Sequence, residues 1–147
     1  MAELIDQQYR LMAVKSVLGD NKLVLTEFHG REGIGRLFDY QLTFLSDDLE
    51  IDHAEIVGTK ISFAIKLREE QTRHFNGYVS SFRAGDLIDI GTEQGKLRSY
   101  SATVVPWIWF LGRAADCRIF QEKSIPDIIK EVFDECGVAD YSASLNG

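Results

Sequence analysis

The chain has 147 residues, of which 45% are hydrophobic and 27% are charged, so it is long and apolar enough to bury a core and is neither disordered nor collagen-like. Its formal net charge of −7 argues against nucleic-acid binding, which requires clustered Lys and Arg, and no apolar run reaches the roughly eighteen residues of a membrane span. The two cysteines, Cys117 and Cys136, form no CxxC pair and are expected to be buried free thiols.

The first segments of the chain predict antiparallel strands joined by tight turns. The apolar run from Tyr9 to Leu18, the turn residues 19–21 and the segment from Lys22 to Phe28 together predict a β-hairpin. The stretch GREGIG, from Gly30 to Gly35, is glycine-rich like a phosphate-binding loop, but a strand follows it where such a loop requires a helix. It is therefore expected to connect two strands.

Four further segments show the period of two that is typical of strands. They read RLFDYQLTFLS, KISFAIKLRE, RHFNGYVSSF and LRSYSATVV. The side chains expected to face the core are Phe38, Tyr40, Leu42, Phe44, Ile61, Phe63, Ile65, Leu67, Tyr100, Ala102 and Val104. Gly77 is expected to mark a bulge or a close approach of two backbones. The chain thus predicts at least six strands, most of them antiparallel.

Two helices are predicted among the strands. The segment IDHAEIVG predicts a short helix with Asp52 as N-cap and Gly58 as its end. The segment KSIPDIIKEVFDECG predicts a longer helix over about 125–136, with Ser124 as N-cap and Gly137 as C-terminal glycine. Its apolar stripe, expected to dock on the strands, consists of Ile125, Ile128, Ile129, Val132, Phe133 and Cys136.

The last ten residues, VADYSASLNG, predict the start of another strand, with Tyr141, Ala143 and Leu145 on one face. A strand that begins without a partner further along the chain suggests a piece of a longer protein. The N-terminal residues are acidic where a signal peptide would be basic, so no cleaved leader is expected.

The sequence offers no catalytic, cofactor-binding or metal-binding residues. The three histidines, His29, His53 and His74, lie in different segments without metal-ligand spacing. The carboxylates in predicted turns are expected to be solvated, which leaves their pKa unsuited to general acid catalysis. These carboxylates are Asp47, Asp48, Glu69, Glu70, Asp86 and Asp89.

The segment PWIWF predicts an aromatic strand that begins at Pro106, because proline cannot donate a hydrogen bond to a ladder. Its two faces are expected to be covered by the core and the docked helix, or by another domain or subunit. Nearby arginines could stack on the indole rings or be solvated. The candidate interface residues are Trp107, Trp109, Phe110, Arg113 and Arg118.

These residues carry a resemblance to a known family. The stretch YSATVVPWIWFLGRAADCRIFQEKSIPDIIKEVF resembles the N-terminal part of VgrG proteins, the spike proteins of the bacterial type VI secretion system, which are related to the tail-hub proteins of contractile phages. The matching features are PW.WFL, D.RIFQ.KS.PDII..VF, GR.....LF.Y.L..LS and F.GYV, which together span Gly30 to Phe133. The combination is specific, whereas no single motif would be.

The resemblance implies a mainly β (α+β) fold, an antiparallel split β-barrel of the phage tail-hub type with one short helix and one longer docked helix. Residues 1–147 would then form an N-terminal hub domain, the first barrel of a longer chain with a second barrel and a β-helical needle. The resemblance also implies a structural protein that trimerises and caps the tube of Hcp protein, and it implies no enzymatic activity. It would contact the PAAR tip protein and effectors through other regions.

The same resemblance implies that the protein resides in the bacterial cytoplasm before firing and is then secreted by the type VI system. The alternative interpretation of the residues is a free-standing β-barrel module that binds a peptide or an oligosaccharide.

Overall fold

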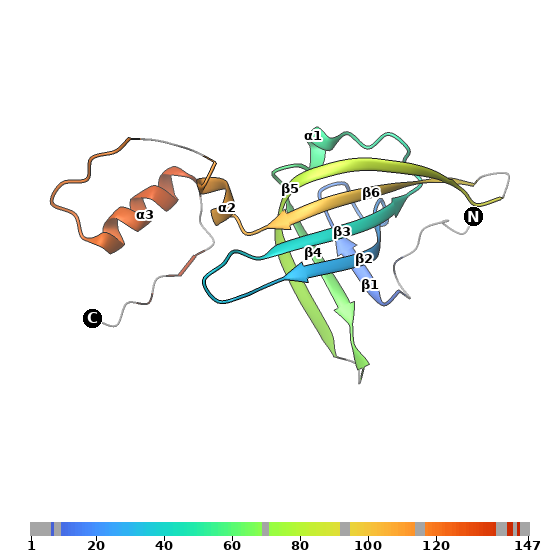
Figure 1. Ribbon diagram of the computed structural model, residues 1–147, viewed down its shortest axis with the longest axis horizontal. Helices are drawn as coiled ribbons and strands as arrows, with labels where there is room; N and C mark the ends of the chain where they lie inside the picture. Colours follow the sequence, from blue (N-terminus) through green and yellow to red (C-terminus); the bar gives the residue numbers. More distant parts are fainter. Residues whose placement is uncertain are drawn as a thin grey trace. The chain divides into compact units, whose positions relative to one another are not determined.

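The computed structural model describes residues 7, 10–68, 71–91, 95–113, 117–137, 141, 142 and 144. The elements in chain order are β1 (Met12–Lys15), β2 (Val24–Arg31), β3 (Asp39–Ser46), α1 (His53–Ile56), β4 (Lys60–Lys66), β5 (Thr72–Asp89), β6 (Lys96–Val105), α2 (Ile108–Leu111) and α3 (Ile125–Glu135) (Figure 1). The chain divides into two compact units, Met1–Pro106 and Trp107–Gly147, which are described separately.

The strands of the first unit form one six-stranded antiparallel sheet in the order β1-β4-β5-β6-β3-β2. β1 and β2 follow each other in sequence but form the two opposite edges of the sheet. The sheet is curled, so that these two edges approach each other. The result is the curled, split half-barrel visible in Figure 1. The expected mainly β fold with an antiparallel split barrel is confirmed.

The predicted hairpin between the first two strands is wrong. The turn exists, since Gly19 and Asn21 both adopt positive φ angles of 97° and 61°. However, β1 pairs with β4 and not with β2, with Val14 opposite Phe63. A turn signal specifies that the chain reverses, but it does not specify which strand becomes the hydrogen-bonded neighbour.

The core of this unit is built from the alternating residues of the strands. Tyr40, Leu42 and Phe44 on β3 are buried, as are the expected inward residues of β6. On β4 the alternation ends early: Leu67 was expected to face the core but is exposed, because the strand ends at Lys66. The alternation thus correctly predicted the core except at a strand end.

Gly77 allows a close approach between β5 and its neighbours. A Cβ atom at this position would lie 2.6 Å from Val104 Cγ1 and 2.9 Å from the carbonyl oxygen of Val105. The prediction of a close approach is therefore confirmed, whereas the register shifts of β5 occur elsewhere, between Val79 and Ser81 and between Ala84 and Leu87.

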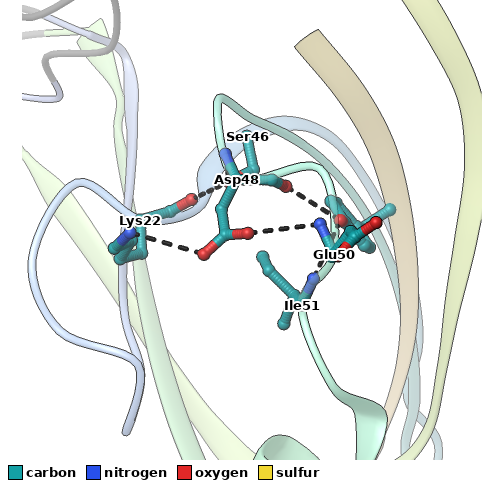
Figure 2. A network of polar contacts seen from close by, with 6 residues as sticks. Lys22, Ser46, Asp48, Glu50 and Ile51 are labelled. Atoms are coloured by element: carbon teal, nitrogen blue, oxygen red, sulfur yellow. Dashed lines mark hydrogen bonds and ion pairs between the residues drawn. The ribbon is translucent and has the colours of Figure 1, made fainter.

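A buried polar network fixes the connection between β3 and α1 (Figure 2). The fully buried hydroxyl of Ser46 donates to the carbonyl of Lys22 at 2.6 Å and accepts from the amide of Asp48 at 3.1 Å. From β6, the Tyr100 hydroxyl donates to the Asp48 carbonyl at 2.8 Å and accepts from the Ile51 amide at 3.2 Å. The network satisfies backbone groups that the turn would otherwise bury without partners.

The short helix α1 begins and ends as predicted. The Asp52 carboxylate accepts a hydrogen bond from the Ala54 amide at 2.9 Å, which is the expected N-cap contact. Gly58 follows with a φ of 82°, the left-handed conformation that ends a helix. Among the described residues, no helix has both the length and the apolar character needed to cross a membrane.

In the second unit the aromatic segment is not a strand. The ladder of β6 ends with Val105 opposite Tyr78, and α2 follows with Trp107 at its N-cap. Pro106 explains the end of the strand, because it lacks the N–H that a further rung would need. Five dense apolar residues fit a helix or a strand equally well, so their composition alone could not distinguish the two.

Helix α3 begins at the predicted residue, with the Asp127 amide donating to the Ser124 hydroxyl at 3.4 Å. The apolar stripe, in contrast, contains no buried side chain, and Ile125 is 75% exposed. Cys117 and Cys136 are free but exposed, so the expectation of buried thiols is wrong. The docking of the helix on the strands stays a prediction.

The predicted C-terminal strand receives no support. Tyr141 is described and belongs to no strand, while Ala143 and Leu145 lie outside the described residues.

Candidate assembly surfaces

The polar residues that could carry chemistry do not converge. His29 lies on β2 and His74 near the start of β5, whereas Arg113 follows α2. Asp86 and Asp89, expected in a turn, lie on the far part of β5. Within the described ranges, no three His, Cys, Asp or Glu side chains form a group that could hold a metal ion.

One aromatic cluster forms around α2. The Arg113 guanidinium carbon lies 4.2 Å from the centre of the Trp109 ring, a cation–π geometry. The Trp109 and Phe110 rings meet edge to face at 5.2 Å. Arg113 thus stacks on a tryptophan, which is one of the two alternatives that the sequence left open, and three of the five candidate interface residues lie together. Their role in an interface stays a prediction.

The other two candidate residues lie apart from this cluster. Trp107 meets the ring of Phe133 at 4.7 Å, and Phe133 in turn meets Tyr141 at 4.9 Å. Burial, followed by the nearby Asp134 carboxylate, raises the pKa of Tyr141 above its usual value. Arg118 forms an ion pair with Glu135 of α3. The five residues thus belong to three separate contacts within the second unit.

The far end of β5 and β6 carries an apolar surface that the sequence did not predict. On one side, β4 pairs only with Thr72–Tyr78 of β5, and on the other, β3 pairs with β6 only as far as Arg98. From the rung of Leu87 and Arg98 onward, residues 87–91 and 95–98 therefore continue as a two-stranded arm that extends past the end of β3 (Figure 1). We call it the β5–β6 arm.

The β5–β6 arm exposes large apolar side chains. Leu87, Ile88 and Ile90 are 55%, 39% and 37% exposed, respectively. Because neighbouring residues of a strand point to opposite faces, Leu87 and Ile88 present apolar surface on both sides of the ribbon. The signal in the sequence was the run LIDI before the turn glycine Gly91, which has a φ of 70°. An isolated two-stranded ribbon is marginally stable in water, so this arm is a candidate for contact with another protein.

A charged cluster joins the β2–β3 connection to β5. The Tyr40 hydroxyl donates to the Glu32 carboxylate, which also pairs with Arg73 at 3.0 Å. The hydrogen bond from Tyr40 holds the pKa of Glu32 below its usual value, while burial and then the bond to Glu32 raise the pKa of Tyr40 to about 12. Beneath the cluster, the rings of Phe28, Phe63 and Phe75 lie about 5 Å apart. The cluster therefore ties β2 and β3 to β5 across the interior of the half-barrel.

By its fold, the chain is a strand-rich split-barrel protein. Residues 31–147 match the family model of the phage tail baseplate hub (GPD), so the chain belongs to this family. The solved structure of the E. coli c3393 protein, described as a component of the type VI secretion system with similarity to the T4 bacteriophage tail proteins gp27 and gp5, has the same fold. It superimposes with a TM-score of 0.64 over 83% of this chain and 31% of its own, at 21% identity. The expected tail-hub type of barrel is thereby confirmed.

Curated relatives include spike proteins of type VI secretion. The spike protein VgrG1b of Pseudomonas aeruginosa is 39% identical over 140 residues, which are 95% of this chain and 18% of the relative. VgrG1c of the same organism is 37% identical over 143 residues, 97% of this chain and 19% of the relative. The actin cross-linking toxin VgrG1 of Vibrio cholerae is 25% identical over 137 residues, only 12% of its length. The chain thus spans about a fifth of the spike proteins it matches.

Proposed function

We propose that this chain acts as the N-terminal hub region of a type VI secretion spike protein. In this role it forms a homotrimer as part of the longer protein, caps the Hcp tube and helps to deliver effectors by mechanical puncture. The observation that carries the proposal is the match to two spike proteins at 37–39% identity over nearly the whole chain. The match of residues 31–147 to the phage hub family supports the same role.

The structure supports an adhesive role through the surfaces that it leaves exposed. The β5–β6 arm offers apolar side chains on both of its faces, and the cluster around Trp109 offers partly exposed aromatic rings beside the exposed Arg113. Aromatic residues and arginine are enriched in protein interfaces. Together, these two surfaces are proposed to contact neighbouring hub regions and the tube. Contacts with the PAAR tip and effectors are assigned to other regions of the longer protein.

The proposed role as a hub also implies that the region performs no chemical step and that the protein is secreted with the spike. The hub region contributes contacts and no chemical step, and any catalytic activity of a related protein is assigned to parts outside the aligned region. The protein resides in the bacterial cytoplasm before firing and leaves the cell with the spike. A hydrolase or transferase activity of the purified chain, abolished by substitution of His29, His74, Asp86, Asp89 or Arg113, would contradict this.

The decisive experiment is a secretion assay in the bacterium that encodes the protein. We expect deletion of the gene to abolish release of the Hcp tube protein into the medium, and the wild-type gene to restore it. Leu87→Asp in the full-length protein should reduce release at least tenfold, because a carboxylate on the β5–β6 arm would be buried in a contact without a partner. Ile34→Asp is the matched control, since Ile34 is a fully exposed side chain in the β2–β3 connection. Normal release in the deletion strain would refute the proposed function.

A further inference from the structure

The edge of β1 that points away from β4 is hydrogen-bonded by a side chain, that of Gln7. The Val14 amide donates to the Gln7 side-chain oxygen at 2.6 Å, and the Gln7 side-chain nitrogen donates to the Val14 carbonyl at 3.3 Å. A neighbouring antiparallel strand makes this same pair of bonds to one residue of its partner. The Gln7 carboxamide therefore occupies the position that the backbone of an additional strand would take.

Among the described residues, β1 has β4 as its one neighbouring strand, and its register directs further backbone groups to the opposite side. The Lys66 amide donates to the Leu11 carbonyl at 2.8 Å, so residues 11, 13 and 15 form the hydrogen-bonded rungs with β4. Met12 and Val14 consequently direct their amides and carbonyls to the opposite side. That side faces the split of the half-barrel, and the described residues of β1 and β2 share no ladder. Two residues thus present four backbone groups along the edge.

An open pocket of about 500 Å³ lies beside this edge, lined by residues of β1, β4 and β5 together with Gln7, Asp20 and Asn21. The floor of this pocket is formed by two rungs of the sheet whose side chains face outward. These rungs are Ala13–Ala64–His74 and Lys15–Ser62–Asn76. Ala13, Ala64 and Ser62 have small side chains, so the floor leaves room for side chains from above. The volume falls in the range of roughly 300–1,000 Å³ that is common for ligand sites.

We propose that the edge of β1 binds an extended segment of a partner polypeptide, which adds to the sheet as a further strand and displaces the Gln7 carboxamide. Strand addition to an exposed edge derives its affinity from main-chain hydrogen bonds and its specificity from alternate side chains. Here Met12 and Val14 supply the main-chain bonds, and the pocket over Ala13 and Ala64 receives one side chain of the segment. Gln7 competes for Val14, whereas no described residue outside β4 is recorded in a hydrogen bond with the Met12 backbone.

The proposal goes beyond the role in the secretion spike. Gln7 and β1 precede Arg31, where the match to the phage hub family begins, so the site does not follow from that match. A polypeptide is favoured over an oligosaccharide because the carboxamide of Gln7 reproduces the donor and acceptor of a peptide group.

The test uses nuclear magnetic resonance of the whole ¹⁵N-labelled chain and a defined probe. The probe is the acetylated and amidated peptide KISFAIK, the sequence of β4, because β4 already pairs with β1 through its other edge. We expect the Met12 and Val14 amide signals to shift and the Gln7 side-chain signals to move to a solvated position. Gln7→Ala should bind the probe about fivefold more tightly, because the competing state is removed and the fraction of open edge rises.

Two controls separate strand addition from other binding. The probe methylated on the amide nitrogens that face β1 should not bind, since it retains the side chains but cannot donate the ladder bonds. Gln41→Ala is the matched control, because Gln41 lies on β3 and hydrogen-bonds Asp39 at 2.9 Å, and it should leave the affinity unchanged. If Gln7→Ala folds poorly, Gln7→Met keeps the length of the side chain but offers neither the carbonyl acceptor nor the amide donor, and should bind more tightly than the wild type.

The result can also overturn the proposal. If neither the wild-type chain nor the Gln7 variants show shifts of Met12 and Val14 at millimolar probe, the edge does not accept a strand. Equal binding of the methylated probe, or weaker binding by Gln7→Ala than by the wild type, would refute it equally.

Discussion

At the scale of single residues, the cluster of Tyr40, Glu32 and Arg73 makes stability depend on pH. The pKa of Tyr40 is raised to about 12 in the folded chain, compared with 10.0 ordinarily. Between these values the unfolded chain loses the phenolic proton while the folded chain retains it. The contribution is therefore intact below about pH 10 and is lost as the pH rises towards 12.

We expect Tyr40→Phe to flatten this alkaline loss of stability. The measurement is the urea midpoint at several pH values between 9 and 12, together with phenolate absorbance of the folded chain. Tyr78→Phe removes another tyrosine of the same sheet and serves as control; it should retain the steep loss. Identical profiles for Tyr40→Phe and the wild type would show that the Tyr40 phenol is not held protonated by burial and Glu32.

Gly77 provides a second prediction at this scale, which concerns packing. In Gly77→Ala, the added Cβ would meet Val104 Cγ1 at 2.6 Å, closer than van der Waals contact allows. We expect a loss of about 1–3 kcal/mol in the free energy of unfolding, because an overpacked core must shift its backbone or side chains. Gly33→Ala is the control, since its Cβ would meet only the flexible Arg36 side chain. A stability of Gly77→Ala equal to the wild type would contradict the close approach.

At the scale of elements, substitution of Phe133 measures how deeply the apolar stripe of α3 is buried. A fully buried phenylalanine replaced by alanine costs about 3–5 kcal/mol, the loss that the apolar stripe of the sequence predicts. Phe133 is only half-buried and contacts the Trp107 and Tyr141 rings. We therefore expect Phe133→Ala to cost about 1–2 kcal/mol, mostly from these ring contacts.

Phe63→Ala is the companion measurement, because Phe63 is buried in the core of the sheet and should show the larger loss of about 3–5 kcal/mol. Both losses are read from urea unfolding followed by circular dichroism. An equal loss for the two variants would mean that Phe133 is buried as deeply as the core, as the sequence suggested.

The elements differ in how far the sequence could predict them. Both capped helices and the alternation of β3 and β6 depend on local signals, namely a capping side chain or a period of two, and these were correct. The partner of β1 depends on contacts between distant segments, whereas β6 ends at Pro106, which lacks the N–H for a further rung. The turn after β1 could not reveal β4 as the neighbour, and the density of apolar residues after Pro106 could not distinguish a strand from α2.

The candidate surfaces show the same division. The stacking of Arg113 on Trp109 was one of two alternatives that the sequence left open, and it could be named because the two residues are four apart in one short segment. The β5–β6 arm was not predicted, because its exposure follows from where β4 and β3 stop pairing with it. The contact between Gln7 and Val14 was likewise hidden, since nothing in a lone glutamine indicates that its carboxamide reaches a strand edge.

At the scale of the whole molecule, the spike proteins that this chain matches are about five times longer than the chain, which bears on the proposed trimer. Obligate interfaces bury more than roughly 2,000 Å² and are rich in apolar side chains. In the described part of the first unit, the β5–β6 arm contributes only Leu87, Ile88 and Ile90 as neighbouring exposed apolar residues. These residues are too few to supply such an interface, so most of the contact area in a trimer must come from other surfaces.

We therefore expect the 147-residue chain to be monomeric at micromolar concentration and to associate weakly near millimolar concentration through the arm. Light scattering after size-exclusion chromatography measures the first state, and sedimentation at increasing concentration the second. Leu87→Asp should remove the weak association, whereas Ile34→Asp, at a fully exposed position of the β2–β3 connection, should not. A tight trimer of the wild-type chain at micromolar concentration would show that this region alone contains the dominant subunit contact, and the arm would then have to be tested as part of it.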